Sequence, residues 1–296
     1  MKNFKQECLM LLDKRGLISR KHVTVDAFRK DFVAHVHYGA LDLGKGDNYI
    51  TELLSLMGDD SILVNPSKTS DNFRMSFDEF IPDLLMNNKL FQYLYPIILK
   101  AKGKGVGEGE LLMPFIIKGY RFTNQNDGEC DGKRIEMKKE GASLKAAKWD
   151  ATKKGVVDEL NNKFFNGHPP GRKSDKLFAE HIKEAEKNPE AYEEYFQALY
   201  PGVDKRDMKR FTEYMKNNYH NKHGVINAIG KLVLKEYQKI DKWDTIIMID
   251  SERKIIVGIN DVNNIESLGL KFTPKLARGG DTQAIADGYV NMSIRG

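Results

Sequence analysis

Cysteine is scarce in this 296-residue sequence, which contains only Cys8 and Cys130. Two cysteines cannot build the multi-bridge framework typical of small extracellular domains. The sequence also lacks an apolar run long enough to span a bilayer, and the apolar run near its start is too short for a secretory signal. It has no internal repeat and no low-complexity tract. We therefore expect a soluble, intracellular protein of the cytoplasm, with no membrane partner.

The excess of one charge sign is small as well. The chain has 47 Lys and Arg residues against 42 Asp and Glu residues, a net charge of +5. This overall value is too small to establish a nucleic-acid partner without knowing where the charge lies. Because 41% of the residues are hydrophobic, the chain can bury a core and need not be disordered. One large domain or two modest ones would fit the length.

The first hundred residues have helical periodicity. Phe28, Phe32 and Val36 recur at intervals of four, as on the buried face of a helix. Ser76 and Glu79 have the spacing of a capping box at a helix start. These patterns predict helices that pack on their apolar faces.

A glycine-rich segment over residues 102–109 cannot form a helix interior. We place a domain boundary there, with a helical N-terminal module over residues 1–101 and a second domain over residues 102–296. Helical signals resume in the second domain, and we expect a helical insertion over about residues 160–240.

Extended patterns dominate between these helical regions. Residues 116–138 form two extended runs on either side of Asp131-Gly132, the dipeptide most favoured in a two-residue hairpin turn. Two short apolar runs, residues 245–249 and 254–257, predict two further strands. The expected fold class is therefore α/β, with a small mixed β-sheet flanked by helices.

The two-residue turn fixes the pairing of the predicted hairpin. Counting outward, the pairs are Cys130 with Lys133, Glu129 with Arg134, Gly128 with Ile135, and Asp127 with Glu136. Because side chains alternate along a strand, Lys138 shares a face with Asp127 and Glu136. Two like charges opposite one another are unfavourable, but a divalent cation reverses the sign of that interaction. Mg²⁺ prefers such oxygen ligands, and a neighbouring lysine can act on the attacking water and the phosphate.

A basic stretch follows the hairpin strand. Between residues 133 and 154, eight Lys and Arg residues accompany only three acidic ones. Such a stretch could hold a polyanion against a metal, or it could be a solvated helix face, and the sequence leaves both readings open. The residues that we consider for contact with nucleic acid are Lys139, Lys145, Lys148, Lys153, Lys154 and Arg172.

Three segments, in this order, resemble the PD-(D/E)XK nuclease superfamily of restriction-endonuclease-like enzymes, of the phage or restriction type. They are the acidic helix start Gly107-Glu108-Gly109-Glu110, then Asp127-Gly128, then Glu136-Met137-Lys138. The resemblance covers roughly residues 103–148. It implies that Asp127, Glu136 and one upstream glutamate bind Mg²⁺, for which Mn²⁺ can substitute, and that Lys138 assists hydrolysis.

The upstream glutamate has two candidates. On a helix, positions two apart point about 200° apart, so at most one of Glu108 and Glu110 can face the site. We prefer Glu110.

The resemblance implies a metal-dependent endonuclease that hydrolyses phosphodiester bonds of double-stranded DNA, in phage DNA processing or in restriction. A restriction-like enzyme would act as a dimer, and a phage enzyme would work in the host cytoplasm or be carried in the virion. The alternative is a non-catalytic DNA-binding or virion structural protein with the same fold, because fold does not fix function. An RNA-directed nuclease is a third reading, but no stacking module with paired aromatics is visible.

Other candidate sites are weaker. His220 and His223 have the spacing of metal ligands on a helix, but no cysteine or third histidine lies nearby in the sequence. Residues 102–107 lack the final Gly-Lys-Ser/Thr of a phosphate-binding loop, which argues against nucleotide binding.

Overall fold

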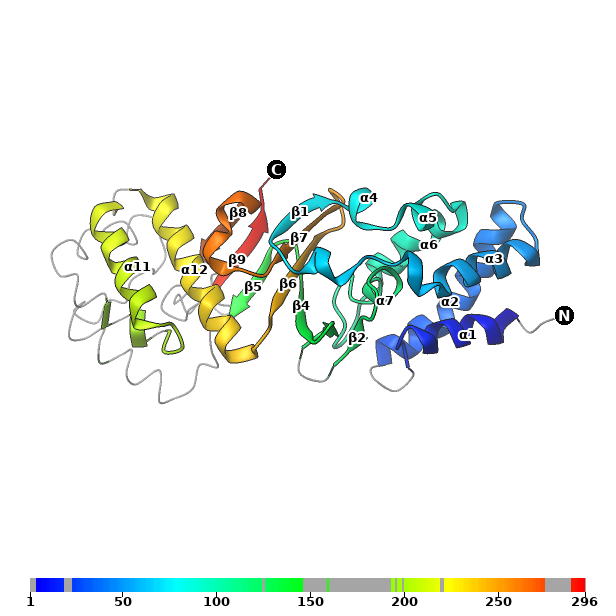
Figure 1. Cartoon of the computed structure of the whole chain (residues 1–296), viewed down its shortest axis with the longest axis horizontal. Helices are drawn as coiled ribbons and strands as arrows, with labels where there is room; N and C mark the ends of the chain where they lie inside the picture. Colours follow the sequence, from blue (N-terminus) through cyan, green and yellow to red (C-terminus); the bar gives the residue numbers. More distant parts are fainter. Residues whose placement is uncertain are drawn as a thin grey trace. The chain divides into compact units, whose positions relative to one another are not determined.

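The structure is a computed structural model that describes residues 4–18, 23–123, 126–145, 159, 193–194, 196–198, 200–218, 221–274 and 289–295. The chain divides into two compact units. The first unit consists of residues 1–140 and 243–261, and the second of residues 141–242 and 262–296. Each combines helices with a β-sheet, which confirms the α/β class (Figure 1).

The helices of the first unit lie almost entirely in its N-terminal part. They are α1 (Phe4–Lys14), α2 (Val23–Asp42), α3 (Asp47–Gly58), α4 (Phe77–Phe80), α5 (Asp83–Met86), α6 (Lys89–Lys100) and α7 (Met113–Ile116), with short 3-10 helices at Asp60–Ile62 and Pro66–Thr69. Helix α1 packs against α2 and α3, and α2 packs against α6 (Figure 1). The predicted apolar face of α2 is confirmed, since Phe28, Phe32 and Val36 are buried.

The predicted capping box is also present. The Ser76 hydroxyl accepts a hydrogen bond from the Glu79 amide at 3.2 Å, and the Glu79 carboxylate accepts one from the Ser76 amide at 2.7 Å. The helix that it opens, α4, ends after four residues, because the next residues run into Pro82.

The sheet of the first unit has six strands in the order β1-β7-β6-β4-β3-β2. Their bounds are β1 (Phe73–Ser76), β2 (Arg121–Phe122), β3 (Gly128–Cys130), β4 (Lys133–Lys139), β6 (Thr245–Asp250) and β7 (Ile255–Ile259). Strands β4 and β6 run parallel, whereas the other neighbours are antiparallel, so the sheet is mixed as expected. Every residue of β6 is buried, which explains its nearly continuous apolar sequence.

The hairpin forms around Asp131-Gly132 in the predicted register. Asp131 has φ of 50° and Gly132 has φ of 74°, the two positive values that a type I′ turn requires. Cys130 pairs with Lys133, and the ladder continues through Gly128 and Ile135. Turn chemistry alone therefore predicted this pairing correctly.

The helical module and the strands share one hydrophobic core. Buried residues of α1, α2, α3 and α6 form a single cluster with residues of the strands, including Ile135, Met137, Ile247, Ile249 and Ile256. The compact units accordingly divide after residues 140, 242 and 261, and not at residue 101. A glycine-rich connection interrupts a helix, but it does not separate cores when both sides bury their apolar faces against each other.

The second unit contains an antiparallel sheet of three strands in the order β5-β9-β8. Its described elements are β5 (Ala142–Lys145), α11 (Lys205–Asn218), α12 (Lys222–Asp241), β8 (Leu270–Pro274) and β9 (Tyr289–Ile294), with 3-10 helices at Val262–Asn264 and Glu266–Leu268. Helix α12 packs on all three strands, and α11 packs on α12 (Figure 1). These helices lie within the predicted helical insertion, most of whose remaining residues fall outside the described ones.

Gly230 permits close packing of α12 on the sheet. A β-carbon at this position would lie 2.2 Å from Cγ of Phe272 on β8, so any larger residue would push the aromatic ring away. Among the helices that the structure describes, none combines the length and the apolar character needed to cross a membrane.

Candidate functional site

The candidate site lies on the hairpin of the first unit, where β4 carries two of the predicted side chains. Ile135 and Met137 are buried at 0% and 5% exposure, whereas Glu136 and Lys138 point to the other face, as alternation predicts. Lys138 Nζ donates a hydrogen bond to Glu136 Oε1. The two side chains are 20% and 12% exposed, so this ion pair is largely removed from water.

Asp127 lies one residue before the start of β3. The ladder between β3 and β4 ends at the pair of Gly128 and Ile135, one place short of the predicted pair of Asp127 and Glu136. Its side chain turns onto the partner strand, where Oδ2 accepts a hydrogen bond from the Met137 amide at 2.7 Å. The acid thus stays fixed to β4 beyond the end of the regular ladder.

The two upstream glutamates have different environments. Glu110 is 7% exposed, and its Oε1 accepts a hydrogen bond from the Gly107 amide at 2.5 Å. Glu108 instead accepts a hydrogen bond from the Ser251 hydroxyl and lies 3.6 Å from Lys102 Nζ.

The acidic helix start expected for this segment is wrong. Residues 108–112 form turns, and the short helix α7 begins only at Met113, with Pro114 in its first turn. Glycine has a steric role here, because a β-carbon on Gly107 would lie 2.6 Å from Glu110 Oε1. A β-carbon on Gly109, which has φ of 88°, would lie 2.1 Å from Ile249. The backbone at Gly109 therefore packs tightly against the sheet. Because this segment forms turns and not a helix, Glu108 and Glu110 have different hydrogen-bond partners.

Tyr120 is a buried tyrosine whose pKa depends on the charges of three candidate acids. It is 5% exposed, and among the described residues its hydroxyl has no hydrogen-bond partner. Burial raises the pKa of the Tyr120 phenol well above its usual value, and the negative charges of Asp127, Glu110 and Glu136 raise it further. The charges of Asp127, Glu136 and the preferred upstream acid, Glu110, therefore all disfavour ionisation of this one phenol.

The position of this phenol depends on Gly128. A β-carbon there would lie 2.1 Å from both Cζ and Oη of Tyr120, so the ring end lies directly against the backbone beside Asp127. Sequence reasoning missed Tyr120, because its contact with Gly128 is a tertiary one. The one local signal is its place at the start of the extended run that becomes β2.

A second charged group lies at the carboxyl ends of the parallel strands β4 and β6. Asp250, 4% exposed, accepts hydrogen bonds from the amides of Glu252 at 3.1 Å and Arg253 at 2.9 Å, and from the Arg253 guanidinium. Burial opposes ionisation of Asp250, but these hydrogen bonds and the charge of Arg253 hold its pKa below the usual value. Arg253 Nη2 also lies 3.7 Å from Glu140 Oε1, just after β4.

Neither cysteine offers a reactive thiolate. Burial raises the pKa of Cys8 to about 12 and that of Cys130 to about 11. Thiolate chemistry at neutral pH is therefore disfavoured at both residues.

The residues predicted to contact nucleic acid are only partly described. Lys139 is exposed at the end of β4, and Lys145 ends β5 in the second unit. Lys148, Lys153, Lys154 and Arg172 lie outside the described residues.

The carboxylates do not yet form a complete metal-binding group. Within the described ranges, no three His, Cys, Asp or Glu side chains come together closely enough to hold an ion. Mg²⁺ needs only one or two protein carboxylates, because waters and phosphate oxygens complete its octahedron. The donor chemistry of Asp127 and Glu136, together with the buried Tyr120 hydroxyl that has no hydrogen-bond partner within the described ranges, therefore fits such an ion with two protein ligands.

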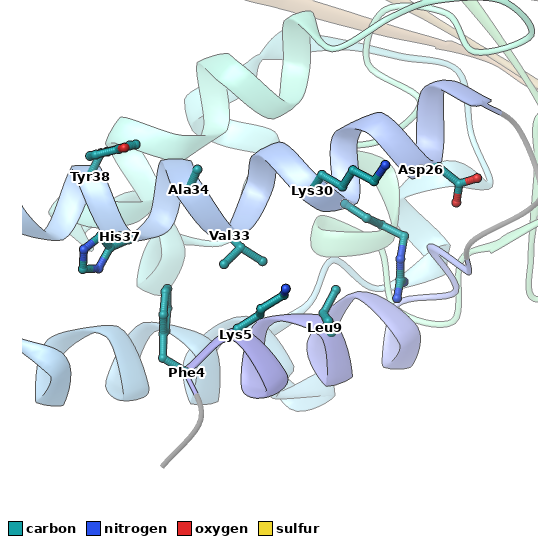
Figure 2. Close-up of a pocket in the computed structure, with 10 residues that line it drawn as sticks. Phe4, Lys5, Leu9, Asp26, Lys30, Val33, Ala34, His37 and Tyr38 are labelled. Atoms are coloured by element: carbon teal, nitrogen blue, oxygen red, sulfur yellow. The ribbon is translucent and has the colours of Figure 1, made fainter. Parts of the chain in front are cut away.

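A cavity of about 700 Å³ lies elsewhere in the first unit, between α1 and α2. Figure 2 shows Phe4, Lys5 and Leu9 of α1 facing residues of α2, and the rings of Phe4 and His37 lie 5.9 Å apart. Of the four acids discussed above on the hairpin and upstream of it, none lines this cavity. Its lining combines apolar side chains with the cations Lys5, Arg29 and Lys30.

Comparison of this chain with known protein families, with curated proteins and with solved structures finds no match.

Proposed function

We propose that this protein is a Mg²⁺-dependent deoxyribonuclease, related to the PD-(D/E)XK superfamily, that hydrolyses phosphodiester bonds of double-stranded DNA as an endonuclease. One observation carries the proposal. The turn at Asp131-Gly132 sets a register in which Asp127 bonds to the Met137 amide, beside Glu136 and Lys138. These two hydrogen bonds on one hairpin support the assignment of Asp127, Glu136 and Lys138 to one site.

Asp127 and Glu136 would hold the ion, and Glu110 is the preferred upstream acid, because its charge raises the pKa of Tyr120 as those of Asp127 and Glu136 do. When bound, Mg²⁺ would neutralise charge that develops on the phosphate and lower the pKa of a bound water. Lys138 Nζ donates a hydrogen bond to Glu136 Oε1. A cation at this position can orient the attacking water and interact with a phosphate oxygen.

A second candidate function is binding without turnover, as in a DNA-binding or virion structural protein with a nuclease-like fold. Two observations favour it. No described group of three acids is preassembled, and Lys138 already neutralises Glu136. A lysine in that place could serve as the permanent counter-ion of a structural carboxylate.

The substitution Glu136→Gln tests the proposal. It removes one ligand charge and keeps the side-chain volume, so we expect the folded protein to persist while Mg²⁺-dependent nicking of a supercoiled plasmid falls by about 100-fold or more. Calorimetric titration with Mn²⁺ should show weaker ion binding in the same variant. This second readout does not depend on turnover.

Glu129→Gln is the matched control, because it makes the same chemical change on the same hairpin. Glu129 pairs with the exposed Arg121 at 2.7 Å, and its loss should leave nicking intact. A Glu136→Gln protein that nicks as fast as the wild type would contradict the assignment. A wild-type protein that binds DNA but never nicks it, with Mg²⁺ or Mn²⁺, would favour the second candidate.

A further inference from the structure

Helix α11 of the second unit has two faces of opposite character. Met208, Phe211, Thr212 and Met215 are buried, so its apolar face is fully used in packing. Helix α12 lies beside it, as the contacts between the two helices show (Figure 1). The outer face of α11 is therefore the part available to a partner.

That outer face is strongly basic. Four cations of this face are exposed: Arg206, Lys209, Arg210 and Lys216. Lys209 and Arg210 follow Arg206 by three and four residues, and Lys216 follows Lys209 by seven, so the four lie on one side of the helix. Glu213 is the exposed acid among them. We call these four cations the α11 basic face.

The remaining acid of the helix does not neutralise this face. Asp207 is half-buried, and its Oδ2 lies 2.6 Å from Nζ of Lys235 on α12. Arg210 is 3.9 Å from the other oxygen of Asp207, but its side chain is 67% exposed. Asp207 therefore pairs more closely with Lys235, on the side of α12, and the Arg210 side chain remains mostly exposed to solvent.

The neighbouring cavity between α11 and α12, about 440 Å³ in volume, is a weaker candidate for the same ligand. Lys231 and Lys235 line it, but Lys231 pairs with Glu266 and Lys235 with Asp207. These two ion pairs account for both lysines and both acids of the cavity, so the excess cation of its lining is Arg210, which belongs to the α11 basic face.

The composition of the face selects the class of partner. A membrane-binding helix needs exposed apolar residues to insert between lipids, and α11 has none among the large exposed hydrophobic residues of the described chain. A peptide partner would need an apolar or aromatic anchor, which this face also lacks. A phosphate backbone needs only cations and polar groups.

The length of the face agrees with a nucleic-acid backbone. From Arg206 to Lys216 the helix rises about 15 Å, at 1.5 Å per residue. Successive phosphates of one strand advance about 3.4 Å along a duplex and also rotate about its axis, so the face is long enough to contact more than one of them.

We propose that the α11 basic face binds the phosphate backbone of DNA, and so forms a substrate-holding surface on the unit that does not carry the carboxylates. The partner class rests on the proposed function, but the binding itself requires no cleavage. Four contacts would contribute about 3 to 4 to the slope of log K against log salt.

The test is a variant in which Arg206, Lys209, Arg210 and Lys216 are all changed to Gln. Affinity for a short DNA duplex is measured by fluorescence anisotropy in EDTA at several salt concentrations, so that no cleavage occurs. We expect the affinity to fall by roughly 10- to 100-fold at 0.1 M salt, and the slope to fall by about 3 to 4. Circular dichroism of the variant should match the wild type, because none of the four side chains is buried.

The matched control changes four exposed lysines of the first unit to Gln: Lys30, Lys45, Lys89 and Lys100. It alters the net charge by the same amount and should change the slope by less than about 1. An equal loss in both variants would overturn the inference, as would wild-type binding to phosphatidylserine vesicles or polyglutamate that matches binding to DNA. If the wild type binds DNA through α11 but does not cleave it, this inference stands and the proposed hydrolysis fails.

Discussion

The two units of this protein place their charges in opposite ways. In the first unit the charged groups of the candidate site are largely buried: Glu110 is 7% exposed, and the Glu136 side chain 12%. In the second unit the charges of α11 face solvent, and Arg210 is 67% exposed. Charges shielded from water interact strongly and specifically, whereas exposed charges are screened by salt and act over a broad surface. The difference suits chemistry on the first unit and backbone binding on the second.

This comparison predicts that the two properties can be separated by mutation. The largest effect is expected for Asp127→Asn, which should lower metal-dependent plasmid nicking by about 100-fold or more, because it removes a ligand charge. Asparagine can still accept the hydrogen bond from the Met137 amide, so the hairpin should persist. DNA affinity measured in EDTA should stay within about twofold of the wild type, because the α11 basic face is unchanged.

Asp131→Asn is the matched control. Asp131 lies at the hairpin tip, about 16 Å along the strand from Glu136 at 3.3 Å per residue, beyond the reach of an ion held by Glu136. Asn-Gly adopts the same turn, so nicking should be unchanged. A protein that loses nicking with Asp131→Asn and keeps it with Asp127→Asn would refute the assignment of Asp127.

A smaller effect, on stability, is expected for Gly128→Ala. The added β-carbon would lie 2.1 Å from the Tyr120 ring, and the resulting overpacking should lower the free energy of unfolding by about 2 kcal/mol in urea titrations. Hydrogen exchange should show faster opening of β3 and β4, with little change in α11 and α12.

Gly58→Ala serves as its control, since a β-carbon there lies 3.8 Å from Leu11, an ordinary contact. Equal stability of the Gly128→Ala variant and the wild type would show that Tyr120 does not lie against Gly128. Hydrogen exchange that becomes equally faster in both units of the Gly128→Ala variant would contradict the expectation that the change destabilises β3 and β4 but not α11 and α12.

The smallest effect is expected for Asp250→Asn and depends on pH. The folded protein holds the pKa of Asp250 below its usual value of about 3.9, so the ionised carboxylate stabilises the fold above that pH. This contribution is lost as the pH falls through the folded pKa. The variant should be less stable than the wild type by about 1 kcal/mol at pH 7, and the two should converge in acid.

Thermal unfolding from pH 7 down to pH 3 measures this convergence. Asp31→Asn, an exposed aspartate on α2, is the control and should follow the wild type throughout. A stability difference for Asp250→Asn that does not shrink as the pH falls would show that its carboxylate makes no charge-dependent contribution.

Local patterns predicted a substantial part of this structure. The Asp131-Gly132 turn set the hairpin register, and alternation separated Met137 from Glu136 and Lys138. These predictions were correct because each depends on neighbouring residues and on steric rules of the backbone. The expectation that a helix starts at Gly107–Glu110 was wrong, because the chain there packs against Ile249 and turns.

The order in the sequence determined which residues could pair across one turn, and it placed Asp127 within reach of Glu136. Only the tertiary structure decided that β4 lies parallel to β6, more than a hundred residues later, and that Tyr120 lies against Gly128. It also decided that Glu110 acts on the same phenol as Asp127, whereas Glu108 bonds to Ser251. Turn geometry is encoded by adjacent residues, but contacts between distant segments arise from the packing of the shared core, which no single stretch of sequence specifies.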